Sequence, residues 1–343
     1  MLAAVLVAPV ASDAQTEPVS AEPTVVHGLY NWVHSTGDAE RAFAFYHDVF
    51  DIELAPSPFI PNAAVPEGIR PWSAVTSDAL IWDLTDTKGS RARTVFMRAP
   101  NTPFGLELSE FVDIARETRA ANPWDAGASR LIFKVRDLDA VVMKLAAHRA
   151  PTVTLGAAPV RARAGRSLLV RDPDGYLVEV IQAATAEVAN AASAGQVVGT
   201  SIGLTVADTE RALALYRDLL GFAVRETWQA DREELGLHGL AAGRLEQTAT
   251  LIPGTAIAVL FAEFTLPAGV TAQPFRWRIQ DVGSPQFQLE VRGLDALIER
   301  TKAAGYRFLS VGAKPIQRPF GRFVFAIDAD GILVEYAEPA APR

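Results

Sequence analysis

The chain has 343 residues, of which 49% are hydrophobic and 21% charged. This is an ordinary globular composition, and the length favours two domains over one. The net charge of −8 indicates no basic surface, so we expect neither nucleic acid nor an anionic membrane as a partner. With no cysteine, the chain has no disulfides, no thiolate catalysis and no cysteine-based zinc site. A small-molecule partner fits best.

The first residues resemble a secretory signal. An apolar run at residues 2–10 is followed by small residues and then by a polar, proline-containing stretch, although the usual basic start is missing. The alternative is a disordered segment over residues 1–22. We expect export to the periplasm or the exterior of a bacterial cell, and a cytoplasmic location if the segment is not a signal. No later apolar run approaches the roughly 20 residues of a membrane helix, so we expect no membrane span.

A strand, a helix and three strands follow in order. Residues 25–35 read as a strand, and apolar residues at helical spacing over 38–50 predict an amphipathic helix with Asp38 as its N-cap. Strands are expected near 80–86, 92–99 and 104–110. The order restarts near residue 130, with a helix near 138–149 and strands near 152–155, 167–172 and 176–182. It begins twice more, near residues 198 and 286.

The two halves of the chain are a tandem duplication. Residues 135–182 align without a gap to 291–338, and residues 38–54 match 208–224. The turns Asp-Pro-Asp-Gly and Asp-Ala-Asp-Gly each precede a strand that contains a glutamate, Glu179 or Glu335. This repetition raises the question whether the glutamate is a metal ligand, a catalytic group or a structural residue.

Three segments fall outside the repeat. A small and polar stretch at 184–195 is typical of a linker. A proline-rich insertion at 56–72 and a second insertion at 228–246, with room for a short helix, interrupt the first and third units. Each insertion could cover a binding site or form a surface strap.

The four repeated units and the motifs "FAFYHDVF", "LALYRDLLGF", "DPDGYLVEV" and "DADGILVEY" resemble the vicinal oxygen chelate superfamily, which includes glyoxalases, epimerases, extradiol dioxygenases and bleomycin-resistance proteins. The resemblance implies an α+β fold in which four βαβββ modules pair into two glyoxalase-like domains with cupped mixed sheets. We expect a first domain over 25–184 (modules 25–112 and 129–184), a linker over 185–196, and a second domain over 197–339 (modules 197–265 and 276–339).

The resemblance also points to four ligand positions in each pair of modules. In the first half these are Asn31, Glu107, Arg130 and Glu179, and in the second Ser201, Leu260, Gln286 and Glu335. Metal-dependent members have histidine and glutamate there, whereas a guanidinium would repel a cation. We therefore predict no metal and no other cofactor in either half.

Within the predicted first cup, Glu107 and Glu179 are the candidate catalytic acid and base. Asn31 and Arg130 are candidate ligand-binding residues. The alternative is a structural salt bridge between Arg130 and Glu179. In the predicted second cup, Ser201, Gln286 and Glu335 are weaker candidates, interpreted as the relic of a degenerate site.

The chain has five histidines. By strand alternation His27 shares the face of Asn31, and His34 points to the other face unless a bulge intervenes. Both are kept as candidate ligand-binding residues. His47, His148 and His238 are predicted to be surface or hydrogen-bonded structural residues.

Three functions are considered. The first is a metal-independent protein, monomeric or homodimeric, that sequesters a small aromatic or anionic molecule or catalyses a lyase or isomerase step on it. The second is a metal-dependent enzyme of glyoxalase, epimerase or extradiol-dioxygenase type. The third is a non-catalytic interaction protein.

Overall fold

The computed structural model describes residues 25–55 and 75–340. The predicted signal segment at 1–22 and the insertion at 56–72 lie outside these described residues. Within them, no helix is long and apolar enough to cross a membrane.

The first two modules follow the predicted order of elements. The first contains β1 (Val26–Ser35), α1 (Ala39–Phe50), β2 (Glu53–Leu54), α2 (Ala79–Thr85), β3 (Arg91–Arg98) and β4 (Gly105–Val112). The second contains β5 (Ser129–Val135), α3 (Leu138–Ala147), η1 (Leu155–Ala157), β6 (Val160–Ala162), β7 (Gly165–Arg171) and β8 (Leu177–Gln182). As predicted, the Asp38 side chain caps α1, accepting from the backbone N–H groups of Glu40 and Arg41.

The other two modules repeat this order. A short helix in the predicted linker, α4 (Thr185–Ala189), precedes the third module, which has β9 (Val197–Val206), α5 (Thr209–Tyr216), β10 (Ala223–Gln229), α6 (Arg232–Leu237), β11 (Arg244–Leu251) and β12 (Ala258–Thr265). The fourth has β13 (Pro285–Val291), α7 (Leu294–Ala303), β14 (Arg307–Phe308), η2 (Val311–Ala313), β15 (Ile316–Arg318), β16 (Gly321–Ile327) and β17 (Leu333–Pro339).

Two predicted strands are wrong. Residues 80–86 form α2 instead, because Asp78 caps a helical turn there and Leu84 then faces an apolar cluster with Phe325 and Leu333. Residues 152–155 make only an isolated bridge between Thr152 and Val170 before η1 begins.

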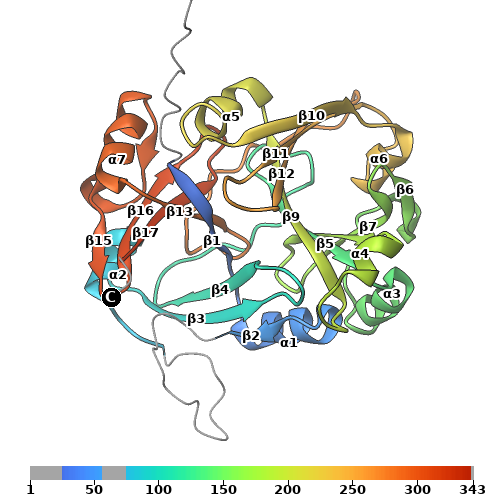
Figure 1. Ribbon diagram of the computed structural model, residues 1–343, viewed down its shortest axis with the longest axis horizontal. Helices are drawn as coiled ribbons and strands as arrows, with labels where there is room; N and C mark the ends of the chain where they lie inside the picture. The colour runs from blue at the N-terminus through green and yellow to red at the C-terminus, as the bar shows by residue number, and fades with distance from the viewer. Residues whose placement is uncertain (1–24, 56–74, 341–343) are drawn as a thin grey trace, which may run out of the picture.

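The modules form two mixed sheets, as the predicted fold class requires, but the expected pairing of consecutive modules is wrong (Figure 1). Sheet 1 has nine strands from the first and fourth modules, in the order β14-β16-β17-β13-β1-β4-β3-β2, with β15 on β16. Sheet 2 has eight strands from the second and third modules, in the order β10-β11-β12-β9-β5-β8-β7-β6.

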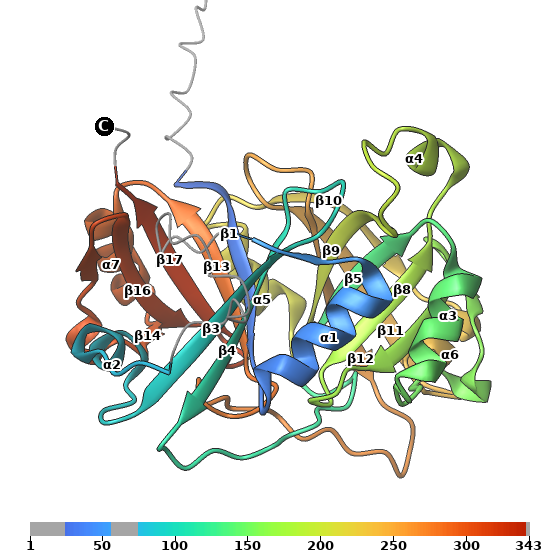
Figure 2. The same cartoon turned by 90° about the horizontal axis from the view of Figure 1, so that it is seen from below.

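The joins within each sheet explain this pairing. In sheet 1, β1 lies antiparallel to β13, and in sheet 2, β5 lies antiparallel to β9. Consecutive modules meet through their helices instead: Phe50 of α1 contacts Phe133 of β5, with ring centroids 4.9 Å apart. The largest apolar cluster draws on both sheets and on α1, α3, α5 and α7, and α1 and α5 lie between the sheets (Figure 2). The opposite face of each sheet, turned away from this core, forms a cup.

Candidate functional site

Four neighbouring strands of sheet 1 bring a polar cluster together on the face turned away from the central core. We call it cup 1 and define it by Asn31 on β1, Glu107 on β4, Gln286 and Gln288 on β13, and Glu335 on β17. Asn31 lies opposite Gln288, and Gln288 lies opposite Glu335. Val33, two residues after Asn31, lies opposite Glu107. Cup 1 therefore combines predicted positions from both halves of the chain.

The prediction that Arg130 and Glu179 share a cup with Asn31 and Glu107 is wrong. Arg130 and Glu179 lie on β5 and β8 of sheet 2, whereas Asn31 and Glu107 lie in sheet 1. Glu335, interpreted from sequence as a relic, is instead the companion of Glu107.

Both carboxyl groups of cup 1 are buried. Glu107 is 7% exposed and Glu335 is 3% exposed. Burial raises the pKa of Glu107 to about 7, although hydrogen bonds from Ser109 and Gln288 act in the opposite direction. Burial, and then the charge of Glu107, raise the pKa of Glu335 well above its usual range. The pair therefore favours states in which at least one carboxyl group holds a proton.

The amide of Gln288 lies between the two carboxyl groups. Its Nε2 donates to Glu107 Oε2 at 3.5 Å, and it also hydrogen-bonds to Glu335. Its Oε1 is buried and has no hydrogen-bond partner among the described residues. Tyr30 faces the same cup, and burial followed by the charges of Glu335 and Glu107 raises the pKa of its hydroxyl.

The other two polar side chains of cup 1, Gln286 and Asn31, are held by local contacts. Gln286 Nε2 donates to Ser35 Oγ at 3.1 Å. The side chain of Asn31 lies over Gly105, where an added Cβ would come within 2.1 Å of Asn31 Oδ1. Only glycine at position 105 leaves room for the present position of Asn31.

The short helix α2 packs on sheet 1 beside this cluster. Its Leu84, with Phe325 and Leu333 of the sheet, belongs to an apolar cluster separate from the central core. Ser310 Oγ donates to the carbonyl of Leu84 at 2.8 Å and ties α2 to the fourth module. One wall of cup 1 is therefore apolar.

The equivalent strands of sheet 2 form cup 2, defined by Ser201, Leu260, Arg130 and Glu179. Arg130 Nε donates to Glu179 Oε2 at 2.8 Å, and an Nη donates to Gln247 Oε1 at 3.3 Å. Arg130 is 3% exposed and Glu179 is 5% exposed. The structural salt bridge that the sequence left open is present, and it neutralises the carboxylate of cup 2.

A helix from the second insertion covers cup 2. Leu237 of α6 packs against Leu169 and Leu177, and its carbonyl accepts from Thr154 Oγ1 at 3.2 Å. The next residue, His238, is 1% exposed, and its Nδ1 has no hydrogen-bond partner among the described residues. Burial, followed by the charge of Arg130, lowers the pKa of His238 well below its usual range. Cup 2 is therefore lined with apolar and neutral groups around one ion pair.

Comparison with known proteins identifies the family. The sequence matches the Glyoxalase/Bleomycin resistance protein/Dioxygenase superfamily over residues 32–180 and 199–336. The chain belongs to this superfamily. Among curated proteins, no relative matches the sequence.

Solved structures of the superfamily share the fold over most of the chain. Glyoxalase I from Zea mays is similar with a TM-score of 0.55 and 16% identity, over 91% of this chain and 92% of that one. A putative dioxygenase from Bacillus subtilis is similar with a TM-score of 0.53 and 11% identity, over 93% of this chain and 87% of that one. At these identities the likeness shows the fold alone.

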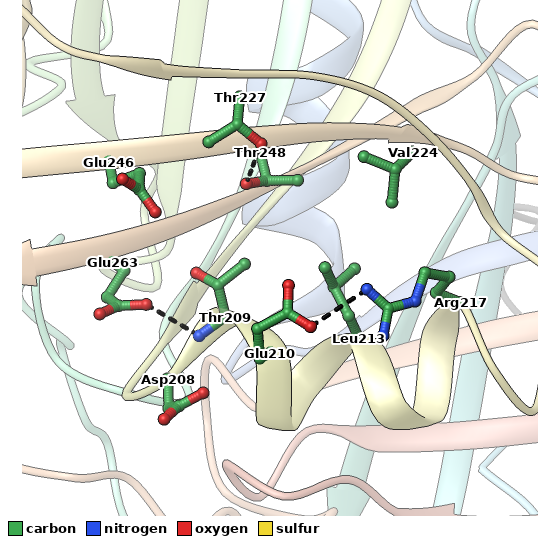
Figure 3. A pocket seen from close by; sticks show the side chains of 10 residues that line it. All are labelled: Asp208, Thr209, Glu210, Leu213, Arg217, Val224, Thr227, Glu246, Thr248 and Glu263. Atoms are coloured by element: carbon green, nitrogen blue, oxygen red, sulfur yellow. Dashed lines mark hydrogen bonds and ion pairs between the residues drawn. The ribbon is translucent and has the colours of Figure 1, made fainter.

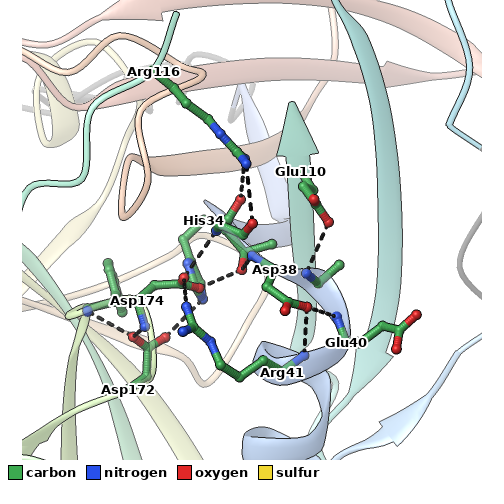
Figure 4. Close-up of polar contacts among 12 residues, drawn as sticks. His34, Asp38, Glu40, Arg41, Glu110, Arg116, Asp172 and Asp174 are labelled. Carbon is green, nitrogen blue, oxygen red and sulfur yellow. Dashed lines mark hydrogen bonds and ion pairs between the residues drawn. The ribbon is translucent and has the colours of Figure 1, made fainter. Parts of the chain in front are cut away.

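The two histidines of β1 lie outside the cups. His27 is exposed, and a bulge between Val26 and Gly28 breaks the alternation on which its placement relied. His34 lies on the other face, as alternation predicts, and is fully buried. Figure 4 shows it beside Asp172 and Asp174. Its Nε2 lies 3.4 Å from Asp172 Oδ2 and 3.3 Å from the Tyr46 hydroxyl.

The acidic corner around His34 has a twin without histidine. Tyr46 donates to Asp172 at 2.8 Å, and Arg41 pairs with Asp174 at 3.2 Å. In the other half, Tyr216 donates to Asp328 at 2.9 Å and Arg211 pairs with Asp330 at 2.6 Å. Leu204 stands at the position of His34 by the repeat. The ligand atoms of His34, Asp172 and Asp174 lie within 4.8 Å of one another, as a metal site requires, but their existing partners and the recurrence favour a structural corner.

Sequence reasoning missed Gln288 and Gln247 at the cups, and it interpreted His238 as a surface or hydrogen-bonded residue, whereas that side chain is buried beside cup 2. Gln288 lies two residues after Gln286, so alternation alone could have placed it on the same face. The other contacts depend on which modules share a sheet, and no local pattern records that.

Proposed function

We propose that the chain transfers a proton on a small organic molecule in cup 1, with Glu107 and Glu335 as the catalytic pair. The observation that carries this proposal is the placement of two buried carboxyl groups on either side of one glutamine, where neither has a cationic partner among the described residues. Buried carboxyl groups without a counter-charge are costly, and such arrangements are concentrated at functional sites.

The chemistry follows from the shared charge of the pair. A charged glutamate takes a proton from a carbon next to a carbonyl, and the protonated glutamate donates to the carbonyl oxygen. The amide of Gln288 holds the two groups in place, and the apolar wall beside α2 excludes water. A lyase or an isomerase of small carbonyl compounds requires this step.

Hydrogen exchange tests the proposal. The full chain is incubated in D2O with a panel of α-hydroxyketones and 2-keto acids, and loss of the C–H signals is followed by proton NMR. We expect Glu107→Gln and Glu335→Gln each to slow exchange about 100-fold or more. Glu299→Gln, the same chemical change on the exposed face of α7, is the matched control and keeps the rate.

Two outcomes separate the alternatives. A compound that binds tightly without exchange supports sequestration in place of catalysis. Exchange that persists in both glutamine variants contradicts the assignment of the catalytic pair.

A metal-dependent version of this function has its own supporting observation. Cup 1 offers two carboxylates and the unpartnered Oε1 of Gln288, which are oxygen ligands of the kind that Mg²⁺ and Mn²⁺ prefer. The sequence-based argument against a metal relied on the missing histidines and on Arg130, and Arg130 lies in the other sheet. The residues of cup 1 therefore fit a divalent cation held by Glu107, Glu335 and Gln288.

A bound cation would polarise a substrate carbonyl as a Lewis acid. The two glutamates would then remain charged, and the hydroxyl groups of Ser109 and Tyr30 would be the proton-bearing groups beside them. Elemental analysis of freshly purified protein, with exchange assays before and after chelation, distinguishes the two versions. Loss of activity on chelation and its recovery with Mg²⁺ or Mn²⁺ supports the metal-dependent enzyme, whereas full activity in chelator supports the metal-independent one.

A further inference from the structure

A third concave site lies on the face of sheet 2 opposite cup 2. It is a groove of about 500 Å³ between α5 and the strands β10, β11 and β12 (Figure 3). Glu246 faces it from β11, whereas the next residue, Gln247, faces Arg130 in cup 2. Successive residues of a strand point to opposite faces, so the groove and cup 2 are separated by the sheet.

The groove carries an excess of negative charge. Its wall includes four carboxylates, Asp208, Glu210, Glu246 and Glu263, and one guanidinium, Arg217. Arg217 is already paired, with Glu210 at 3.1 Å and with Asp218 at 2.7 Å. No other cation faces the groove among its lining residues.

The first module has an oppositely charged pair where the groove of the third module has two carboxylates. There Arg93 lies directly opposite Glu110 on the neighbouring strand, and the two side chains are 2.7 Å apart. In the third module the corresponding cross-strand pair is Glu246 and Glu263. Like charges directly opposite each other on neighbouring strands are destabilising unless something compensates them.

The glutamate nearest the helix has the same local role in both modules. Glu110 accepts from the backbone N–H of Ala39 at 3.1 Å, and Glu263 accepts from that of Thr209 at 2.8 Å. The helix start therefore explains one carboxylate in each module. It does not explain the second carboxylate, Glu246, in the third.

A buried hydroxyl provides an independent observation. Thr209 is only 7% exposed, and its Oγ1 has no hydrogen-bond partner among the described residues. It points into the groove on the side of Glu246 and Glu263 (Figure 3). A buried hydroxyl without a partner is costly, and a ligand with hydrogen-bond donors would satisfy it.

We propose that this groove binds a small organic cation that carries at least one ammonium group. The ammonium lies between Glu246 and Glu263 and donates to them and to Thr209 Oγ1. The apolar part of the ligand lies on Leu213 and on Val224, which is 40% exposed. The volume is that of a site for an organic molecule, larger than a single metal ion needs.

Isothermal titration calorimetry at fixed ionic strength tests this proposal on the full chain. The probes are 1,5-diaminopentane, the neutral 1,5-pentanediol and Ca²⁺. We expect the diamine to bind and the diol not to bind. Glu246→Arg rebuilds the cross-strand pair of the first module and should weaken diamine binding about ten-fold or more, because it removes a charge-assisted hydrogen bond.

The matched control is Glu299→Arg, which makes the same charge change on the exposed face of α7 and should leave diamine binding within about two-fold. Thr209→Ala should weaken it by a few-fold. If Glu246→Arg does not fold, as judged by its thermal transition, Glu246→Gln replaces it with the same expected direction. Undetectable diamine binding at millimolar concentration, equal weakening by Glu299→Arg, or tighter binding of Ca²⁺ than of the diamine overturns the proposal.

Discussion

Cup 1 and cup 2 lie on equivalent strands at the same register, but their buried carboxylates have different partners. Gln286 lies opposite Leu333 in sheet 1, and Arg130 lies opposite Leu177 in sheet 2, so the two are equivalent positions. With arginine there, Glu179 is paired. With glutamine there, Glu335 shares its cup with Glu107 and both pKa values rise. Two differences therefore decide whether the buried glutamate is neutralised or available for chemistry. One is arginine or glutamine at this position, and the other is Glu107, whose place in cup 2 is taken by Leu260.

The largest expected effect comes from breaking the ion pair of cup 2. Arg130→Ala leaves Glu179 as a buried carboxylate without a cation, and removal of one partner of such a pair costs about 3 to 5 kcal/mol. Urea unfolding at pH 7 measures the loss. Exchange activity at cup 1, referred to folded protein, should not change, because the two cups lie in different sheets.

The double variant Arg130→Leu/Glu179→Leu sharpens this test. Replacement of a buried ion pair by apolar side chains is often neutral or stabilising, so its unfolding free energy should return to within about 1 kcal/mol of the wild type. A double variant as unstable as Arg130→Ala would show that the packing of Arg130 against Gly203, rather than charge, holds cup 2 together.

The next effect is the contribution of Glu107 to the pH dependence of stability. Because the pKa of Glu107 is raised to about 7, the folded state binds more protons than the unfolded state between about pH 4.5 and pH 7. Stability should therefore fall as the pH rises through this window, by about 3 kcal/mol for this group alone. Glu107→Gln should remove most of that fall, as measured by unfolding at pH 5 and pH 8.

Glu179→Gln is not a suitable control here because it leaves Arg130 buried without its partner, so Glu299→Gln, on the exposed face of α7, takes that place. An unchanged pH profile in Glu107→Gln would show that Glu107 is charged and compensated at neutral pH. A divalent cation bound to Glu107 is one such compensation. In that case, removal of the cation from the wild type with a chelator would restore the fall of stability with rising pH.

The two cups also show what the sequence could and could not predict. The repeat located Glu179 and Glu335 on the correct strands, because alternation and the Asp-x-Asp-Gly turns are local signals, and the family resemblance located Glu107 on β4. It could not say which module pairs with which, because each module offers a similar first strand for an antiparallel join. Sharing a cup is decided by that join, so Arg130 and Glu179 were paired correctly but were placed in the wrong cup, beside Glu107. The strand expected at 80–86 failed for a related reason: a short apolar run fits either element until its neighbours are known.

The third prediction concerns a substitution that gives cup 1 the arginine of cup 2. Gln286→Arg places a guanidinium where Arg130 stands in sheet 2, within reach of Glu335 by the same register. We expect the pKa of Glu335 to fall, exchange activity to be lost, and stability at pH 8 to rise by about 1 to 2 kcal/mol. The nearly isosteric Gln286→Met is the control, because it removes the bond to Ser35 without adding charge. Full activity in Gln286→Arg would contradict the view that this position sets the state of the pair.

The smallest effect concerns the corner where the halves differ by one buried histidine. His34→Leu gives the first half the residue that Leu204 provides in the second, and it removes a buried Nδ1 that has no partner among the described residues. The unfolding free energy at pH 7 should change by less than about 1 kcal/mol.

The same variant should change the pH dependence of stability. Burial raises the pKa of Asp172 to about 6 while His34 lowers it, so in His34→Leu that pKa should rise further, and more stability should be lost between pH 5 and pH 7. The reverse change, Leu204→His, buries a polar ring without a prepared partner and should cost more than His34→Leu gains. If His34→Leu instead costs several kcal/mol, the His34–Asp172 contact is an essential ion pair and the two corners are not equivalent.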